Sequence, residues 1–431
     1  MGTALRDHET GAATGIVFPT HPQALLDAGP AFLTRAFRAY GTLPAGAQVR
    51  AIRDAADCPA GNSGKKLFLT LDYAGAPPGT PHHLFVKFSR QFDDPFRDRR
   101  ARELEGEVRL ADLSRAPAFP VKVARAMFAD CHHASGSGVL ITERIGFGQG
   151  NVEPIRAKCR DHELADPARY YRATVRALAR LAGAQKAGRL SPRLEQLFPW
   201  DRAIAEADPP RGWDAGLAAA KARAIAAFIG SAPQLFPAAV TAPDFAARLV
   251  ADAVAFVNHE AQVRRFLQSN PDFIALGHWN TNIDNAWFER QPDGEFEAGL
   301  LDWGMVRQMN AGYALWGGLS ASDPPMLARE LDGLLALYAR ELAASGGPVL
   351  DLAALAMHFD LSVMLLGIAL MFDCPALVAA RLPGYATATG PHDSRLAADQ
   401  VAQGFLHVFT NCLMLWESRD FGATLRRLSE G

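Results

Sequence analysis

The sequence has few cysteines, lacks a long uninterrupted apolar run and carries almost no net charge. Its five cysteines (Cys58, Cys131, Cys159, Cys374 and Cys412) form no C-x-x-C pair, and their odd number argues against a disulfide framework. No uninterrupted apolar run reaches the roughly 18 residues that a membrane helix needs, and the first residues lack the basic and apolar regions of a secretion signal. These absences predict a cytoplasmic protein that neither spans nor binds a membrane.

The charge balance also limits the choice of partners. A formal net charge of -2 over 431 residues gives no global positive field, so we expect no nucleic-acid partner. The histidine pairs at 82–83 and 132–133 show no paired ligand motif at zinc spacing, and we interpret them as loop residues. With 49% hydrophobic residues, the chain is long enough to bury the cores of two domains.

The first part of the chain has the pattern of a small α+β unit. Apolar and polar residues alternate as in strands in KKLFLTLDYAG (65–75) and HHLFVKFS (82–89). A helical pattern in RRARELEGEVRLADLSR (99–115) and a short buried strand, GVLITERI (138–145), follow. We therefore expect a partly mobile N-terminal extension at 1–30 and a small domain at 31–145.

Beyond residue 145 the pattern becomes almost wholly helical, which predicts a second domain at 146–431. The helical periodicity is clearest in five long segments rich in Ala, Leu and Arg, at 168–187, 214–229, 243–268, 325–345 and 350–373.

Residues 285–302 interrupt this helical region with two strand-like runs around Asp293-Gly294, a strong signal for a two-residue hairpin turn. Residues equidistant from that turn would pair, so Arg290 would face Glu297 and Asn285 would face Asp302. Amide and carboxylate oxygens at such a cross-strand distance, about 4.5–5.5 Å between Cα atoms, suit a hard cation such as Mg²⁺. A structural hairpin whose terminal Asn and Asp cap turns is the alternative interpretation.

Lys87 is the second candidate for a functional residue. It lies in the alternating apolar strand LFVKFS, where a buried ammonium group is unfavourable unless it meets an anion. The helix that follows carries Glu103 and Glu107, four residues apart and so on one face.

A strand lysine, a helix glutamate, the glycine-containing turn AGNSGKK (60–66) and a strand leading into a helical domain form the ground plan of a kinase N-lobe. The chain resembles the small-molecule phosphotransferases of the aminoglycoside/choline kinase group, which have a protein-kinase-like fold, and particularly their ecdysteroid-kinase-like branch. The resemblance runs from about Phe32 to about Phe372 and rests on FLTRAFRAYGTLPAGAQVRAI (32–52), YYRATVRALARLAGAQ (170–185) and LLDWG (300–304).

This resemblance implies an α+β, two-lobed protein-kinase-like fold. The small N-lobe would contain an antiparallel sheet, and the large, mainly helical C-lobe would carry a catalytic-loop hairpin at 278–302 and the helices that bind the acceptor.

The resemblance also implies a site for ATP and Mg²⁺. Lys87 would bind the α- and β-phosphates and pair with Glu107, with Glu103 as the alternative, while Asn285 and Asp302 would hold Mg²⁺. Residues of the glycine-containing turn would cover the phosphates, and backbone groups at the end of the strand 138–145 would hold the adenine. These residues are Gly61, Asn62, Ser63 and Gly64 for the phosphates, and Glu143 to Ile145 for the adenine.

The catalytic loop departs from the family pattern at its most important position. The family usually has His-Gly-Asp, whereas this chain has His278-Trp279-Asn280, with Asn285 five residues after Asn280. His278 would be the structural histidine, and Asn280 stands in the place of the catalytic aspartate. A neutral amide cannot take a proton near pH 7, and a general base is typically worth ~10²–10⁴-fold in rate. Asp284, the only carboxylate of the loop, either substitutes as the base or is a solvated loop residue.

Two functions follow from these residues. The first is an ATP- and Mg²⁺-dependent kinase that phosphorylates the hydroxyl of a small-molecule acceptor. It would be slowed rather than inactivated by Asn280, because positioning and charge carry most of phosphoryl transfer. The alternative is a nucleotide-binding pseudokinase with a ligand-sensing or scaffolding role.

Overall fold

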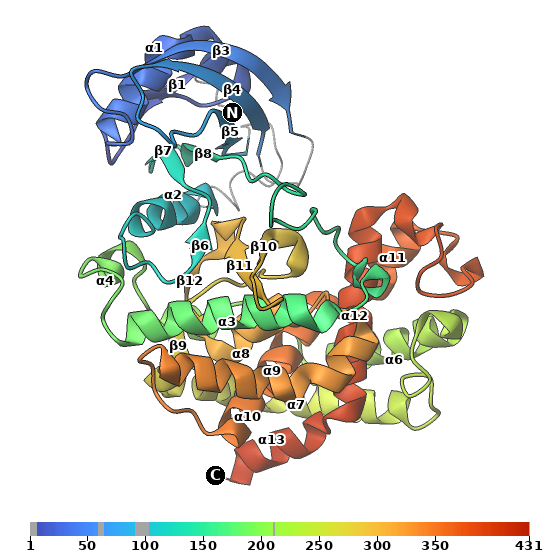
Figure 1. Cartoon of the computed structure of the whole chain (residues 1–431). Coiled ribbons are helices and arrows are strands. Elements are labelled where there is room, and N and C mark those ends of the chain that lie inside the picture. Colours follow the sequence, from blue (N-terminus) through green and yellow to red (C-terminus); the bar gives the residue numbers. More distant parts are fainter. Residues whose placement is uncertain (1–6, 59–63, 91–102, 210–211, 431) are drawn as a thin grey trace. The chain divides into compact units, whose positions relative to one another are not determined.

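The computed structural model describes residues 7–58, 64–90, 103–209 and 212–430, and the chain divides into two compact units (Figure 1). The small unit comprises residues 1–152, 190–197 and 299–306. The large unit comprises residues 153–189, 198–298 and 307–431.

The small unit is built on a five-stranded antiparallel sheet with the strand order β3-β4-β5-β8-β7. In β4 every second residue is buried, as the alternating sequence predicts. The sheet strands are β3 (Gln48–Asp57), β4 (Lys66–Ala74), β5 (His83–Phe88), β7 (Ala126–His132) and β8 (Ser137–Glu143). The other elements of the unit are β1 (His8–Thr10), β2 (Val17–Pro19), α1 (Pro22–Ala39), α2 (Glu103–Leu113), β6 (Lys122–Val123), α4 (Leu194–Leu197) and the 3-10 turn η6 (Trp303–Met305).

The N-terminal residues 7–30, assigned above to an extension, belong to this unit through Asp130. This aspartate of β7 is fully buried, and its carboxylate accepts hydrogen bonds from Ala13 N at 3.1 Å, Thr14 N at 2.9 Å and Thr14 Oγ1 at 2.5 Å. A Cβ on Gly11 would lie 2.0 Å from Asp130 Oδ2, so only glycine fits there. One buried carboxylate therefore fixes the β1–β2 hairpin to the sheet.

The large unit is mainly helical. Its helices are α3 (Pro167–Lys186), α5 (Arg202–Ala207), α6 (Ala215–Ser231), α7 (Phe245–Ser269), α8 (Ala311–Leu319), α9 (Pro324–Ala344), α10 (Leu352–Leu366), α11 (Cys374–Arg381), α12 (Gln400–Ser418) and α13 (Phe421–Glu430). Its strands are β9 (Ile274–Gly277), β10 (Ala286–Arg290), β12 (Arg307–Asn310) and the first part of β11 (Phe296–Leu300). A small sheet unit and a large helical unit confirm the predicted α+β class, and the five long helical segments are confirmed to within two residues at their starts.

Aspartates set the starts of several of these helices. Asp214, Asp351 and Asp399 each accept a hydrogen bond from the backbone N–H three residues later, at 2.8, 2.8 and 2.9 Å. Asp323 caps α9 in the same way through Met326 N at 3.3 Å. Such a cap satisfies one of the N–H groups that a helix start leaves without an intrahelical partner.

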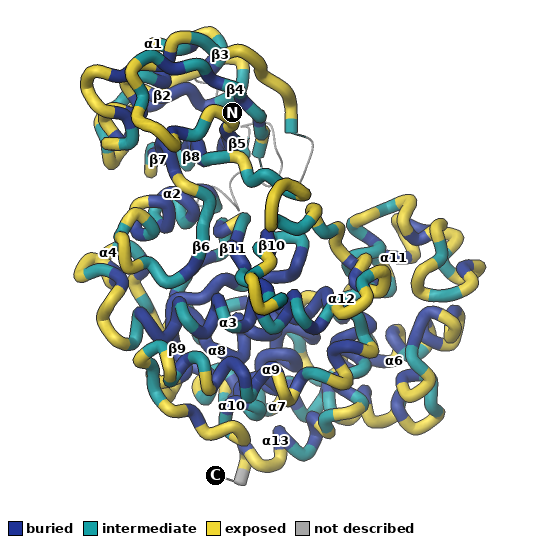
Figure 2. The backbone as a smooth tube through the Cα atoms, viewed as in Figure 1, coloured by how far each residue is buried: buried dark blue, intermediate teal, exposed yellow. Residues whose placement is uncertain are grey.

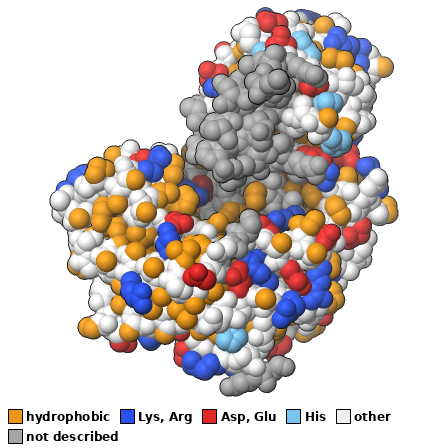
Figure 3. All heavy atoms as spheres, turned by 180° about the vertical axis from the view of Figure 1, so that it is seen from behind, with side chains coloured by type: hydrophobic (Ala, Val, Ile, Leu, Met, Phe, Trp, Pro, Cys, Tyr) orange, Lys and Arg blue, Asp and Glu red, His pale blue; other side chains and the backbone are white. Residues whose placement is uncertain are grey.

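The core of the large unit lies around α8 and α10, which Figure 2 shows mostly in the colour of buried residues. One stretch, Leu352–Met371, is long and apolar enough to cross a membrane, with a mean hydropathy of 1.9. It is 72% buried inside the structure, and a helix in a protein core can have the same length and hydropathy. Hydrophobic side chains also reach the surface, where they gather on one side of the large unit in Figure 3.

A buried histidine of α10 makes the stability of this core dependent on pH. His358 is 2% exposed and stacks on Phe273 and Phe266, with ring centroids 3.8 and 4.7 Å apart. Its Nδ1 lies 2.9 Å from Asn310 Nδ2, which donates to it. Burial lowers the pKa of His358 to about 4, so the folded protein keeps the imidazole neutral at pH 7.

We expect His358 to make the wild type lose stability as the pH falls. Between pH 6.5 and about pH 4 the unfolded chain binds a proton on His358 that the folded chain does not bind. This difference lowers the free energy of unfolding by about 3 kcal/mol over that pH range. Buried Asp360 has a pKa raised by burial to about 6 and acts in the opposite direction, so the comparison must be between variants. Denaturant titrations at pH 7 and pH 4.5 should show a smaller loss for His358→Phe than for the wild type. The control, His8→Phe at an exposed histidine, should lose as much unfolding free energy as the wild type. An equal loss in His358→Phe and the wild type would contradict this account.

Candidate functional site

The small unit brings Lys87, Glu107 and Asp302 together. Lys87 of β5 and Glu107 of α2 are each 5% exposed, and Lys87 Nζ lies 2.6 Å from Glu107 Oε1 and 2.7 Å from Asp302 Oδ1. The Asp302 side chain is 45% exposed, so the cluster has one buried end and one open end. Glu103, the alternative partner of Lys87, instead pairs with Arg90 at 3.3 Å. The predicted Lys87–Glu107 pair is therefore confirmed.

The two carboxylates and the ammonium group shift one another's protonation. Burial works against the charged form of Lys87, but Glu107 and Asp302 outweigh it and raise the pKa of the ammonium group above its usual value. Burial raises the pKa of Glu107 to about 7, with Lys87 opposing that shift and Asp302 adding to it. Lys87 is therefore a permanent buried cation at neutral pH.

The turn LLDWG places Asp302 through an unusual backbone conformation. Asp302 adopts left-handed φ and ψ angles of 55° and 60° immediately before η6. Trp303 Nε1 donates to Leu300 O at 3.0 Å and closes the turn. A Cβ on Gly304 would lie 3.0 Å from Glu103 Cγ, so the missing side chain lets the turn approach α2. Strained backbone of this kind is concentrated at functional sites.

The glycine-containing turn is described only at its end. Gly61, Asn62 and Ser63 lie outside the described residues. Gly64 has a φ of +66°, and a Cβ there would lie 1.9 Å from Phe88 O, next to Lys87. The end of the turn therefore lies against β5 and requires glycine.

Lys66 is a residue of this site that the sequence reasoning missed. It is the cross-strand partner of Lys87 in the β4–β5 register, and its Nζ donates to Gly64 O at 3.4 Å. Burial and then the charge of Lys87 lower the pKa of the Lys66 ammonium group. The signal was present in the sequence, because Lys66 and Lys87 fall on the same face once the two alternating strands are paired.

The predicted adenine-binding segment lies at the end of β8. Glu143 N donates to Arg125 O at 2.9 Å, and Arg144 N donates to His83 O at 2.9 Å. The Glu143 side chain accepts from Arg125 N at 2.9 Å. The backbone N–H groups of Glu143 and Arg144 are thus engaged within the small unit, so a base would have to use the backbone of half-buried Ile145 or the carbonyl groups.

The large unit contains the loop HWNTNIDN, which follows β9. Strand β9 pairs with β12 from Gly277–Arg307 to Ile274–Asn310, and the loop then enters the 3-10 turn η5 (Ile283–Asn285). His278 is fully buried, and its Nδ1 accepts a hydrogen bond from Asn280 N at 3.1 Å. This is the position of a structural histidine that holds the loop.

The three asparagines of this loop form one hydrogen-bonded set. Asn282 Nδ2 donates to Asn280 Oδ1 at 2.9 Å and to Gly317 O at 3.0 Å, and its Oδ1 accepts from Ala321 N at 3.1 Å. Asn285 Nδ2 donates to Asn280 O at 3.0 Å, which leaves its Oδ1 as the atom that could bind a cation. Asn280 is half-buried and is not turned into the core. Asn282, which the sequence reasoning did not single out, anchors the loop to α8.

Asp284 lies near another carboxylate of the large unit, that of Asp161. Asp161 is 1% exposed and accepts a hydrogen bond from Tyr171 Oη at 2.5 Å. Burial raises the pKa of Asp161 to about 7, and the charges of Asp284 and Asp323 add to the shift. Asp284 is itself half-buried, so it belongs to an acidic group and is not a fully solvated loop residue.

The hairpin differs from its predicted register by one residue. Gln291 N donates to Glu295 O at 2.8 Å, so the loop contains three residues, Pro292 to Gly294, with Gly294 at a φ of +85°. Arg290 then stands opposite Phe296, with its guanidinium carbon 5.1 Å from that ring, and not opposite Glu297 as predicted. The predicted cross-strand pairing of Asn285 with Asp302 is wrong for the same reason, because this register no longer places the two residues opposite each other. Three-residue hairpin loops with a left-handed glycine are the next most common class after the two-residue turns that Asp-Gly favours.

The described residues include no group of three or more His, Cys, Asp or Glu side chains arranged to hold a metal ion. Mg²⁺ does not require one, because it usually takes one or two protein carboxylates together with water and phosphate oxygens.

Comparison with known proteins gave matches only among solved structures. No family model and no curated protein matches the chain. An aminoglycoside-3'-phosphotransferase of type VIII is 19% identical, with 77% of this chain and 98% of that chain covered and a TM-score of 0.36. A macrolide 2'-phosphotransferase from Brachybacterium faecium is 12% identical, with 83% and 91% covered and a TM-score of 0.34. A choline kinase from Cryptosporidium parvum is 8% identical, with 88% and 90% covered and a TM-score of 0.38.

These matches fall in the same group of small-molecule phosphotransferases that the sequence motifs resemble. Because their TM-scores lie below 0.5, the geometry of this chain's own residues carries the functional argument.

Proposed function

We propose that this protein is an ATP- and Mg²⁺-dependent phosphotransferase that acts on the hydroxyl group of a small molecule. The observation that carries the proposal is the buried Lys87 between Glu107 and Asp302. A lysine held by a helix glutamate, beside a half-exposed aspartate in a left-handed turn, is the arrangement in which kinases bind phosphates and a metal ion.

The roles of the remaining residues follow from their chemistry. Lys87 would bind the α- and β-phosphates, with Lys66 as a second cation and Gly64 at the end of the phosphate-covering turn. The carboxylate of Asp302 would be a hard oxygen ligand for Mg²⁺, and the amide oxygen of Asn285 is a ligand of the same chemical kind. A bound Mg²⁺ would supply charge neutralisation at the phosphates.

Asn280 and Asp284 would act on the acceptor. The Oδ1 of Asn280 is held by Asn282, so its NH₂ group would face the acceptor and orient it by donating a hydrogen bond. Proton removal would then fall to Asp284, the carboxylate of the loop.

A nucleotide-binding pseudokinase is the second candidate, and Asn280 is the observation that favours it. Both functions need the Lys87 cluster, so only the chemistry at Asn280 and Asp284 separates them.

We also propose that the protein acts in the cytoplasm. All five cysteines are free, and four of them are buried, which supports a reducing compartment.

Mg-ATP is expected to stabilise the protein, because a ligand that binds only the folded state at 100 times its Kd adds about 2.7 kcal/mol. A calorimetric melt with and without millimolar Mg-ATP measures this. Asp302→Ala should abolish most of the shift, whereas Asp57→Ala, an exposed aspartate at the end of β3, should retain it. An unchanged Tm in the wild type, or an equal shift in Asp302→Ala, would show that the site does not bind Mg-ATP.

A further inference from the structure

One face of the five-stranded sheet carries two kinds of side chain. Residues of β4 and β5 alternate between the core and this face, and the register pairs Lys66 with Lys87 and Phe68 with Phe85. The two lysines therefore lie side by side. The two half-buried phenylalanines lie next to them, with ring centroids 6.1 Å apart. The face thus has a cationic end and an aromatic end.

The aromatic end is the one nearer to the predicted adenine-binding segment. Strand β8 runs next to β5 and pairs Leu140 with Lys87 and Thr142 with Phe85. From the lysines, the face therefore leads past Phe85 to the segment that follows Thr142. A nucleotide whose phosphates bind at the lysines and whose base reaches residues 143–145 would place its base over the phenylalanine rings. Aromatic rings in such a position are stacking surfaces for a base.

An arginine covers this stacking surface. The guanidinium carbon of Arg144 lies 3.8 Å from the centroid of the Phe68 ring, well within the range of a cation–π contact. A base that stacked on the same face of Phe68 would need the space that the guanidinium group fills. In addition, the Thr142 hydroxyl donates to Glu143 O at 3.0 Å, so this carbonyl group already has one partner. The chain's own side chains therefore close the aromatic end.

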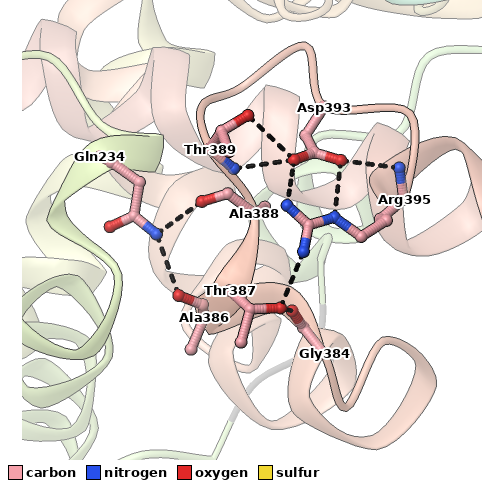
Figure 4. Close-up of polar contacts among 8 residues, drawn as sticks. All are labelled: Gln234, Gly384, Ala386, Thr387, Ala388, Thr389, Asp393 and Arg395. Carbon is pink, nitrogen blue, oxygen red and sulfur yellow. Dashed lines mark hydrogen bonds and ion pairs between the residues drawn. The ribbon is translucent and has the colours of Figure 1, made fainter.

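The contact of Arg144 is weak enough for a ligand to displace it. Arg395 in the large unit shows a stronger arrangement, since its Nε donates to Asp393 Oδ1 at 2.9 Å and its Nη1 to Thr387 Oγ1 at 3.0 Å (Figure 4). Arg144 is exposed, and within the described residues its side chain has the Phe68 ring as its partner in place of a carboxylate. Such a contact changes a binding equilibrium by only about two- to fivefold, equivalent to ~0.5–1 kcal/mol.

We propose that Arg144 is a specificity-determining residue of the proposed nucleotide site. It occupies the stacking face of Phe68 in the free protein, so a nucleotide has to displace it before the base can stack. A polyphosphate without a base binds at the lysines and leaves it in place. This inference rests on the proposed function, because it takes the phosphates to bind at Lys87.

Calorimetric titrations of the full chain with Mg-ATP and with Mg-tripolyphosphate test the proposal. The ratio of the two Kd values isolates the contribution of the base, since a lost positive charge affects both ligands. We expect Arg144→Ala to shift this ratio about fivefold in favour of ATP. Arg115→Ala is the matched control and should leave the ratio unchanged. Its guanidinium carbon lies 4.4 Å from the ring of Tyr40, which belongs to the core on the other face of the sheet.

Two further measurements show whether Arg144 acts through Phe68. In a Phe68→Leu background, which removes the ring, Arg144→Ala should no longer change the ratio. In NMR spectra of the free wild type, the side-chain protons of Arg144 should be shifted upfield by the ring current of Phe68. Mg-ATP should remove this shift, and Mg-tripolyphosphate should retain it.

The outcomes separate this inference from the proposed function. The inference is overturned, and the proposed function stands, if both ligands bind and Arg144→Ala leaves the ratio unchanged. The same holds if ATP binds and tripolyphosphate does not, if the effect persists in Phe68→Leu, or if Mg-ATP leaves the Arg144 protons shifted. Binding of neither ligand to any of these proteins overturns both.

Discussion

Replacing Lys87 by methionine is expected to lower the free energy of unfolding by about 3–5 kcal/mol at pH 8, the usual effect of removing one partner from a buried ion pair. Methionine keeps most of the side-chain volume, so the loss comes from Glu107, which would be left as a buried carboxylate without its cation. Denaturant titration of the variant beside Lys65→Met, a change at an exposed lysine, measures the difference. The control should stay within about 0.5 kcal/mol of the wild type.

The pH dependence identifies the cause of this loss. The pKa of Glu107 is already raised to about 7 with Lys87 present, and removing the cation raises it further. Below pH 7 both proteins carry a protonated Glu107, so the difference in stability should shrink towards pH 5.5 and grow above pH 7. The double variant Lys87→Met/Glu107→Gln should lose this pH dependence. A loss that is equal at pH 5.5 and pH 8.5 would mean that packing, rather than the buried charge, sets the stability.

The strands and the Lys87–Glu107 pair could be predicted because local patterns determine them. The strand-like pattern around Lys87 predicted β5, and the spacing of Glu103 and Glu107 placed both on one helix face. The contact of Lys87 with Asp302 could not be predicted in the same way. It depends on a residue 215 positions away in left-handed backbone, which no local preference of aspartate dictates.

The hairpin and the asparagine loop show where local signals stop being sufficient. Asp-Gly correctly predicted a hairpin, but Pro292 became part of a three-residue loop and shifted the register by one residue. The loop at 278–285 was identified from its composition, yet the role of Asn282 is set by Gly317 and Ala321, which the fold brings to it. The roles of residues whose partners are distant in sequence can be assigned only from the tertiary structure.

Replacing Asn280 by aspartate separates the two proposed functions, because it restores the family's usual base with little change of shape. Aspartate can still accept the hydrogen bond from Asn282 Nδ2, so the loop should keep its geometry. For the phosphotransferase, the new carboxylate adds a second negative charge beside Asp284 and removes the NH₂ group that orients the acceptor. Transfer of labelled phosphate from ATP should then fall about tenfold or more, equivalent to ~1.4 kcal/mol of transition-state stabilisation.

For a pseudokinase the same variant should instead awaken ATP hydrolysis or weak transfer, since a general base contributes ~10²–10⁴-fold. Asp284→Ala completes the comparison. It should reduce transfer by the ~10²–10⁴-fold of a general base if Asp284 is that base. It should have no measurable effect in a protein without activity. Because His278 and Asn282 hold the loop in both cases, the melting temperatures of all three proteins should agree. Faster transfer in Asn280→Asp together with an inert Asp284→Ala would reject the phosphotransferase mechanism proposed for Asn280 and favour the pseudokinase.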